Sequence, residues 1–458
     1  MSSTRQPALT LLEDRRRRSA RRSWWTDGLE AAVWLAAVTG IALMIASGGV
    51  AYATSPADWL YAAGRAFGIV AAVLMMAQVL LASRVPWVER AIGHDRAIAV
   101  HTRWGKVAIV LMLVHLAIMT TVTASYDGRS VGAQVFAWPE YGWWMLAALV
   151  AATAFIVVLV TSLTAVRLRW PYERWHAVHM LVYIGVAFAV PHQFLEGSTF
   201  RAGGIAWWFW AVLWTLSIGS FVLFRLIRPV VRIGRHGLMV ESVTPLADGS
   251  TTVTVAGRNL DRLKAQPGQF FLWRFLSPEL RTQQHPYSLS AAPGDRLRIT
   301  VKPSGFGSTA VKNLTPGTRV MVEGPLGIFT HQSRTRSALV LVAAGIGVTP
   351  VRSMLEECEP GDDVTVIVRA RSRDEAPLLD EIEDLATARG ATVHLLLGSR
   401  GQTWGTRENP ASISDLVASP QDADVYICGP RGWAQVVAAD ALAAGVAPAA
   451  IHREEFGW

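Results

Sequence analysis

HTRWGKVAIVLMLVHLAIMTTVT (residues 101–123) and HAVHMLVYIGVAFAVPHQFL (residues 176–195) are two long, mostly apolar stretches that decide the fold of this chain. Each has about 20 residues, the length that a helix needs to cross a hydrocarbon core of ~30 Å. Four more stretches of this kind lie at residues 29–50, 60–82, 143–166 and 205–227. The sequence therefore predicts six membrane-spanning helices.

Arginines gather on one side of the predicted membrane. They cluster within residues 15–22, 84–96, 167–174 and 225–235, whereas the alternate loops hold Arg129, Arg201 and little else. Because short cytoplasmic loops carry an excess of Lys and Arg, we expect both termini and the second half of the chain in the cytoplasm of a multi-pass cell-membrane protein. The net charge of +8 comes from these flanks. That distribution argues against a nucleic-acid surface.

Four histidines, His101, His115, His179 and His192, lie inside the third and fifth stretches. Ionisable side chains within a membrane are costly, so they are functional candidates. His101 and His115 are ~20 Å apart along their helix at a rise of 1.5 Å per residue, and so are His179 and His192. Both helices start on the cytoplasmic side, so His101 and His179 share one depth, and His115 and His192 share the other. Paired neutral imidazoles suit the axial positions of an electron-transfer haem. His176 is an alternative to His179, and buried structural histidines are the plain alternative.

The first half of the chain resembles the ferric-reductase transmembrane domain shared by NADPH oxidases and ferric-chelate reductases. That family has two pairs of histidines at these spacings on its third and fifth spans. The resemblance implies two b-type haems, with the four histidines as iron ligands. It also implies an electron acceptor on the outer side, either dioxygen or a ferric chelate. The alternative function is an electron-supply module for a protein or quinone partner. Arg65, Arg103 and Arg201 are candidate partners for haem propionates.

The motif His285-Pro286-Tyr287-Ser288 follows a change to short alternating segments after about residue 228. Such segments, broken by Gly and Pro, predict a small antiparallel barrel. The motif resembles the flavin motif of the ferredoxin–NADP reductase superfamily, in the version found in NADPH oxidases. That resemblance implies non-covalent FAD, with Tyr287 on the flavin ring, Ser288 near its N5 atom and His285 near its phosphates or ribityl chain.

A small-residue loop follows at Val301-Lys302, with Gly307-Ser308-Thr309 opening a short predicted helix. Small residues allow backbone N–H groups to approach a pyrophosphate. This loop resembles the superfamily's pyrophosphate loop.

From residue 337 onward, predicted strands alternate with helices, which indicates a parallel α/β unit. A buried strand runs into Gly345, Gly347 and the Thr349-Pro350 pair, a strand–turn–helix context that suits a dinucleotide phosphate. Cys428-Gly429-Pro430 follows a later strand, and in the superfamily such a motif lies beside the nicotinamide. A small buried residue is the plain reading of Cys428. The resemblance also implies a near-terminal aromatic, Phe456 or Trp458, over the flavin.

The segment Arg371-Ser372-Arg373 follows the predicted second strand of this unit, where the adenosine ribose lies in the fold. Arginine holds a phosphate with paired hydrogen bonds, so the segment favours NADPH over NADH. Asp374 and Glu375 oppose this, and a solvated charged loop is the alternative.

These patterns divide the chain of 458 residues into a basic N-terminus (1–28), a six-helix di-haem domain (29–228), an FAD-binding barrel (229–334) and an NAD(P)H-binding α/β domain (335–458). The expected function is a transmembrane oxidoreductase that moves electrons from cytoplasmic NAD(P)H through FAD and two haems to an outer acceptor.

Overall fold

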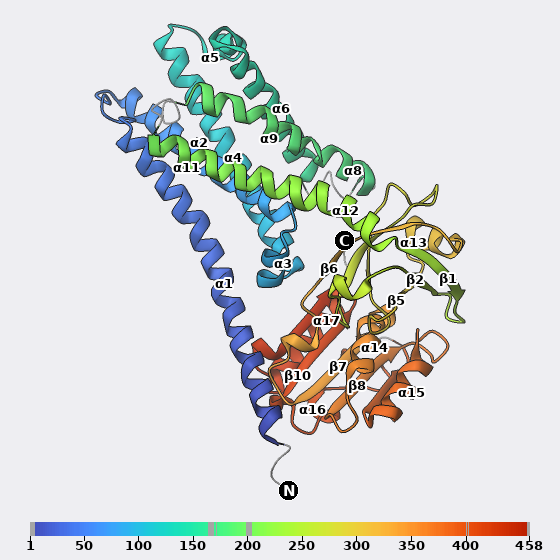
Figure 1. Ribbon diagram of the computed structural model, residues 1–458. Coiled ribbons are helices and arrows are strands. Elements are labelled where there is room, and N and C mark those ends of the chain that lie inside the picture. Colours follow the sequence, from blue (N-terminus) through green and yellow to red (C-terminus); the bar gives the residue numbers. More distant parts are fainter. Residues whose placement is uncertain are drawn as a thin grey trace. The chain divides into compact units, whose positions relative to one another are not determined.

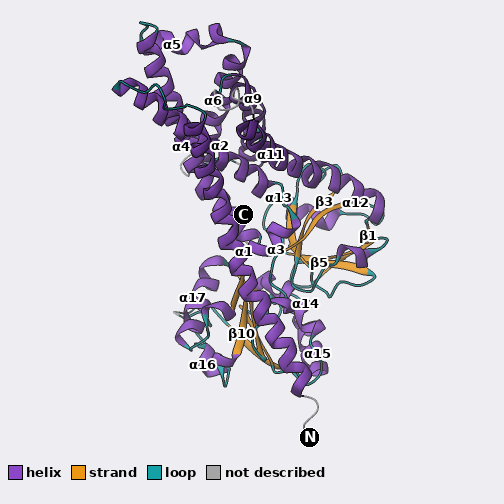
Figure 2. Cartoon of the chain, turned by 60° about the vertical axis from the view of Figure 1, so that its left-hand side comes forward, coloured by secondary structure: helices purple, strands orange, loops and turns teal. Residues whose placement is uncertain are grey.

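The computed structural model describes residues 5–163, 169–170, 172–197, 204–399, 401 and 403–455. The chain divides into two units, which we describe separately. The membrane unit comprises residues 25–88 and 95–227, and the soluble unit comprises residues 1–24, 89–94 and 228–458. Figure 2 shows the strands gathered in the soluble unit.

Six helical segments of the described chain are long and apolar enough to cross a membrane, which agrees with the predicted spans. They are Asp27–Ala46, Pro56–Ala82, Arg96–Tyr126, Trp143–Ser162, Arg174–Leu195 and Gly204–His236. The helices that supply them are α1 (Arg5–Ala46), α2 (Pro56–Ala82), α4 (His94–Tyr126), α6 (Trp143–Ser162), α8 (Tyr172–His179), α9 (Leu181–Leu195), α11 (Gly204–Phe221) and α12 (Arg228–His236), with a π-helical segment at Val222–Ile227 between the last two. Shorter helices are α3 (Pro86–Ile92), α5 (Val131–Ala137) and a 3₁₀ turn at Trp138–Tyr141.

Local sequence explains where α2 begins. The Ser55 hydroxyl accepts a hydrogen bond from the Asp58 backbone N–H at 3.2 Å, and the Asp58 carboxylate accepts one from the Ser55 backbone N–H at 2.8 Å. This reciprocal cap satisfies two amides that the helix itself cannot. Pro56 then occupies the first helical turn, where no backbone donor is needed.

One apolar cluster holds the membrane unit together. It contains buried side chains from α1, α2, α4, α6, α9 and α11 (Figure 1), and Leu74 and Trp210 are almost fully enclosed. On the outside of the bundle, large apolar side chains such as Leu35, Trp208 and Leu216 are exposed. In a membrane these side chains would face lipid.

The fifth span is divided at Met180 into α8, which ends at His179, and α9, which begins at Leu181. Met180 itself has right-handed helical angles, with φ of −64° and ψ of −16°, and its N–H donates to the His176 carbonyl at 3.0 Å. The expected span therefore continues across this residue.

The antiparallel part of the soluble unit consists of two three-stranded sheets, ordered β1-β2-β5 and β4-β3-β6. The strands are β1 (Met239–Pro245), β2 (Thr251–Ala256), β3 (Phe270–Phe275), β4 (His285–Ser288), β5 (Arg296–Val301) and β6 (Val320–Leu326). Single bridges, Leu289 with Ile299 and Met239 with Arg319, join the two sheets. The expected closed barrel is therefore wrong in detail, because continuous ladders do not link the sheets, although both enclose one core around Trp273 and Ile299.

The rest of the soluble unit is a parallel sheet ordered β11-β10-β7-β8-β9. Its strands are β7 (Ala338–Ala344), β8 (Val364–Ala370), β9 (Thr392–Leu397), β10 (Ala423–Gly429) and β11 (Ile451–Glu455). Its helices are α14 (Val348–Glu357), α15 (Leu379–Arg389), α16 (Ile413–Leu416) and α17 (Arg431–Ala443). The predicted alternation of strands and helices is confirmed, and β7 and β10 are buried along their whole length, as parallel strands covered on both faces should be.

The strand order of this sheet reverses between β7 and β10. From β7 the chain builds outward through β8 and β9, and it then returns to the other side of β7 with β10 and β11. In open α/β sheets, ligands bind outside the carboxyl ends of the strands at such a reversal. The end of β7 is therefore the position where a nucleotide is expected.

Ion pairs connect the antiparallel sheets to the α/β sheet. Arg298 on β5 and Arg352 on α14 both contact Glu381 on α15, each at 2.8 Å. The Ala292 backbone N–H also donates to Glu356 at 2.6 Å. These contacts hold the expected flavin motif and the expected nucleotide motif within one unit.

Candidate functional site

His101 and His179 meet inside the membrane unit. Their ring centroids are 6.2 Å apart and their planes cross at 67°. Two metal–nitrogen bonds of about 2 Å, plus roughly 1 Å from each nitrogen to its ring centre, would separate the centroids by roughly 6 Å. The pair predicted from helix position is thus brought together at a separation that suits one metal ion between the rings.

Trp175 helps to choose between His179 and His176. Its ring stacks on His179 with centroids 5.0 Å apart and planes at 27°, whereas its contact with His176 is longer, at 6.5 Å. Stacking restricts the His179 ring to one orientation. The structure therefore favours His179 as the partner of His101.

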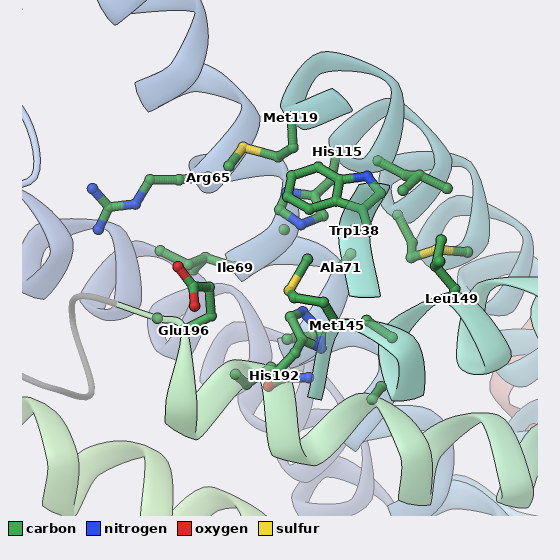
Figure 3. Close-up of a pocket in the computed structure, with 18 of the residues that line it drawn as sticks. Arg65, Ile69, Ala71, His115, Met119, Trp138, Met145, Leu149, His192 and Glu196 are labelled. Carbon is green, nitrogen blue, oxygen red and sulfur yellow. The ribbon is translucent and has the colours of Figure 1, made fainter. Parts of the chain in front are cut away.

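His115 and His192 line a second part of the bundle, a cavity of about 480 Å³. Figure 3 shows both rings among its lining side chains, with His115 on α4 and His192 on α9. Most of the wall is apolar, including Met75, Met112, Met119, Met145, Phe155 and Val186. The cavity reaches the surface, because Tyr126, Asp127, Tyr141 and Glu196 both line it and are exposed.

The hydrogen bond of His115 fixes which of its nitrogens can bind a metal. Its Nδ1 lies 2.8 Å from the backbone carbonyl oxygen of Gly64 on α2. A carbonyl can only accept, so Nδ1 carries the proton and donates it. The Nε2 atom then has a free lone pair, which is the form that ligates a metal.

The residues present fit the iron of a haem, which the porphyrin ring already holds. Within the described residues, no group of three or more His, Cys, Asp or Glu could hold a metal ion. A haem would need only two ligands from the protein, and a pair of histidines could supply them. Gln78 on α2 is a further polar group without a protein partner, since it is 5% exposed and both its amide atoms lack hydrogen bonds. Arg65 lines the cavity and is the candidate for a propionate there, Arg103 lies on α4, and Arg201 lies outside the described residues.

The flavin motif lies on β4, next to β3. The Trp273 indole donates to the Tyr287 carbonyl oxygen at 2.9 Å, and the His285 ring stacks on Tyr287 with centroids 5.7 Å apart. Burial raises the pKa of the Tyr287 phenol. The Tyr287 and Ser288 hydroxyls are buried and have no hydrogen-bond partner in the described protein. Buried hydroxyls without partners are costly, so this site suits a ligand that hydrogen-bonds to them. Pro286 continues strand β4 between His285 and Tyr287, where it pairs with Leu272 of β3.

Gly307 brings the predicted phosphate loop against the flavin motif. A Cβ at this position would lie 2.6 Å from His285 Nε2 and 2.7 Å from Gln283 Oε1, closer than real atoms approach. Ser308 caps helix α13 (Phe306–Ala310), because its hydroxyl accepts from the Ser304 and Gly305 backbone N–H groups at 2.8 and 2.9 Å. Thr309 is exposed, Lys302 is half-buried, and the Val301 side chain is buried in the core. Val301 can therefore meet a cofactor only through its backbone.

The two nucleotide motifs meet at the reversal of the parallel sheet. Gly345 has a φ of +56°, which favours glycine. A Cβ on Gly347 would lie 2.6 Å from the Cys428 carbonyl carbon and 3.0 Å from the Gly429 nitrogen. The Thr349 hydroxyl donates to the Ile346 carbonyl at 3.0 Å, so it stabilises the turn, and Pro350 is buried beside it.

The Cys428 side chain is fully buried in the core on one face of the sheet. Its position at the end of β10 agrees with the prediction, but the thiol itself is covered. Gly429 and Pro430 lead from the strand into α17. Phe456 and Trp458, the candidate flavin-covering aromatics, lie outside the described residues.

The arginine-rich segment begins directly after β8, as expected, so Arg371 is in the loop that follows the strand. Arg373 contacts Asp380 at 3.2 Å and also Glu383, and the pKa of its guanidinium is raised mainly by Glu383. Arg371 is exposed, Ser372 is half-buried, and no described residue pairs with Arg371. Of the two predicted arginines, Arg371 is the one open to a phosphate.

Three residues near these sites could not be selected from the sequence. Gly64 and Gly68 lie against His115, and Trp175 lies against His179. The four-residue spacing of the glycines is a recognised signal of close helix packing in membranes. Nothing in the spacing alone, however, tells which helix they approach.

Comparison with known proteins agrees with both halves of the chain. Residues 67–190 match the family described as ferric reductase like transmembrane component, and residues 341–439 match the family described as oxidoreductase NAD-binding domain. The first range includes His101, His115 and His179. The expected resemblance is therefore confirmed.

Relatives in sequence include proteins named flavohemoprotein. The one from Bordetella pertussis is 34% identical over 212 residues, which is 42% of this chain and 52% of that protein. The one from Vibrio cholerae is 30% identical over 239 residues, which is 49% of this chain and 60% of that protein. The chain spans about half the length of the curated relatives it matches. A solved structure of the flavohem-like FAD/NAD-binding domain of nitric oxide dioxygenase from Vibrio cholerae is 26% identical, with a TM-score of 0.40, and covers 48% of this chain and 98% of that chain.

The contact at Gly307 gives a test of the flavin site. We expect Gly307→Ala to lower flavin content at least tenfold, because the new methyl group collides with the His285 ring. Gly305→Ala is the matched control, since its Cβ meets nothing within 4 Å and its φ of −173° suits any residue. Flavin fluorescence per purified chain measures the effect. Equal flavin content in the two variants would contradict the assignment.

The choice of His179 over His176 gives a second test. His179→Ala should halve the haem content per chain measured as the pyridine haemochrome, because one iron loses a histidine ligand. His176→Ala, three residues away, should leave the haem content at the parent value. The reverse result would assign the inner ligand to His176.

Proposed function

We propose, from the premise that one chain joins a ferric-reductase-like transmembrane domain to an oxidoreductase NAD-binding domain, that this protein is a transmembrane electron carrier. It would take electrons from cytoplasmic NAD(P)H and pass them through FAD and two b-type haems to an acceptor on the far side. NAD(P)H as the electron source, and the integral membrane setting, follow from the two domains.

The observation that carries this proposal is the pairing of histidines at two depths of one bundle. The ring centroids of His101 and His179 are 6.2 Å apart. His115 follows His101 by fourteen residues, His192 follows His179 by thirteen, and both line one cavity. A structural role would not require a second histidine opposite each ring. Two pairs at separate depths instead suit two metal centres ~20 Å apart along the helices.

At the nucleotide site, the chain would bind the dinucleotide and orient it. The Gly345–Gly347 turn allows the backbone to approach a pyrophosphate, and the N-terminus of α14 favours its negative charge. Gly347 lies against Cys428 and Gly429, so a bound dinucleotide would cross from one motif to the other at the end of β7. Oxidation of the nicotinamide releases a hydride, which the neighbouring flavin site must receive.

At the flavin site, the buried hydroxyls of Tyr287 and Ser288 would bind and orient the ring, and His285 and Gly307 would hold the phosphate end. A bound flavin supplies the chemistry that separates a two-electron hydride into single electrons. The histidine pairs then hold the groups that carry those electrons across the membrane.

The acceptor site would be the outer cavity. Its exposed lining includes Asp127 and Glu196, and Arg65 is its one cation within the described lining. An acidic rim repels an anionic ferric chelate and leaves neutral dioxygen unaffected. We therefore rank dioxygen, giving superoxide, ahead of a ferric chelate, with delivery to a protein or quinone as the alternative.

The experiment that tests the function uses the full chain in sealed vesicles. NADPH is added outside, where only chains with the flavin half outside can use it, and electron delivery to the lumen is followed with an entrapped impermeant superoxide probe or entrapped ferric citrate. We expect a lumenal superoxide signal and slower reduction of ferric citrate. NADPH oxidation without any lumenal signal would exclude transmembrane transfer, and faster ferric citrate reduction would reverse the ranking of acceptors.

Preference for NADPH should depend on Arg371 rather than Arg373. Arg371→Ala should lower the NADPH/NADH ratio of kcat/KM for flavin reduction by roughly tenfold, the effect of losing charge-assisted hydrogen bonds to the 2′-phosphate. Arg373→Ala should change it much less, because Asp380 and Glu383 already engage that guanidinium. A parent ratio below one, or a larger effect at Arg373, would contradict this preference.

A further inference from the structure

We propose that Gly64 and Gly68 of α2 form a seat for His115 that aims its Nε2 atom into the outer cavity and tunes the potential of the metal bound there. The inference rests on the proposed function, because it takes His115 to be an iron ligand. It assigns to α2, which supplies none of the four histidines, the role of positioning the outer centre.

The seat consists of one hydrogen bond and one close approach. His115 Nδ1 donates to the Gly64 carbonyl at 2.8 Å. A Cβ on Gly68 would lie 2.7 Å from Nδ1, 2.9 Å from Cε1 and 3.1 Å from Cγ of the same ring. Three ring atoms therefore lie over the bare Cα of Gly68. Any larger residue at this position must push the ring away from the Gly64 carbonyl.

Gly64 also sets how closely α2 and α4 approach. A Cβ on Gly64 would lie 2.7 Å from Ile118 Cγ2 and 3.3 Å from Met119 Sδ, which are on the next turn of α4 after His115. Glycines four residues apart allow two membrane helices to pack with their backbones close together. The carbonyl of Gly64 keeps a second lone pair beside its helical hydrogen bond, and that lone pair can accept from the ring.

This hydrogen bond has an electronic consequence for a bound metal. An imidazole that donates its N–H to an acceptor becomes a more basic ligand at its other nitrogen. A more basic ligand stabilises the ferric state and lowers the reduction potential of the iron. The seat would thus make the outer centre a stronger reductant, which assists transfer to an acceptor in the cavity.

The test is a redox titration of purified full chain, with both haem signals followed by absorbance and by the low-spin ferric EPR spectrum. In Gly68→Ala we expect one of the two potentials to rise by about 59 mV, which is a tenfold change in the ferric-over-ferrous preference for a one-electron couple. The other potential should stay as in the parent. Gly40→Ala is the matched control for crowding of the cavity wall, since its Cβ would lie 2.9 Å from Ile69 and 3.0 Å from Trp210, which both line the cavity, and no histidine is among its nearest atoms. It should leave both potentials as in the parent.

A second pair of variants keeps the proposal testable if Gly68→Ala fails to bind the outer haem. Gly64→Ala should raise the same potential, because Ile118 is pushed away and the hydrogen bond lengthens. Adding Ile118→Ala removes the colliding atoms and should restore the parent potential. Reduction potentials equal to the parent's in both glycine variants, or no recovery on adding Ile118→Ala, would contradict the proposed role of the two glycines. Absence of haem from the parent itself would instead overturn the proposed function.

Discussion

A histidine ring inside a membrane is costly unless its nitrogens find partners, and this cost explains the surroundings of His115. Such a ring needs an acceptor at one nitrogen and, where it is to bind a metal, a free lone pair at the other. For His115 the acceptor is the Gly64 carbonyl, and the other nitrogen is left for a ligand in the cavity. His101 and His179 face each other directly, with Trp175 stacked on the second ring. The glycines of α2 lie where the Gly64 carbonyl and the Gly68 Cα come close to the His115 ring.

In the soluble half, backbone groups rather than side chains would bind the ligand. A pyrophosphate needs amides at close range, so glycines occupy the positions where a side chain would collide. Gly307 against His285 and Gly347 against Cys428 bring together motifs that are separated by about 22 and 81 residues, respectively. The ion pairs of Glu381 with Arg298 and Arg352 connect the two kinds of sheet. One unit can therefore present a flavin site and a nucleotide site in a defined relation.

Much of this architecture could be predicted from the sequence, because length and hydropathy specify spans and alternation specifies the parallel sheet. The alternation predicted from residue 337 onward is present as strands β7 to β11 with helices between them. Features that depend on contacts between distant residues could not be predicted. Whether six antiparallel strands close into a barrel depends on ladders between their edges, and here single bridges replace them. The engagement of Arg373 by Asp380 and Glu383 depends on how a loop folds onto α15.

The central claim is that NAD(P)H delivers electrons to iron held by histidine pairs at two depths of the membrane unit. An anaerobic titration of the purified full chain with NADPH, monitored by the haem and flavin absorbance bands together, tests it most directly. The account predicts two low-spin haems for each flavin, and both haems become reduced once the flavin has taken up hydride. A chain that binds no haem, or one whose flavin is reduced while bound haem stays oxidised, would contradict it.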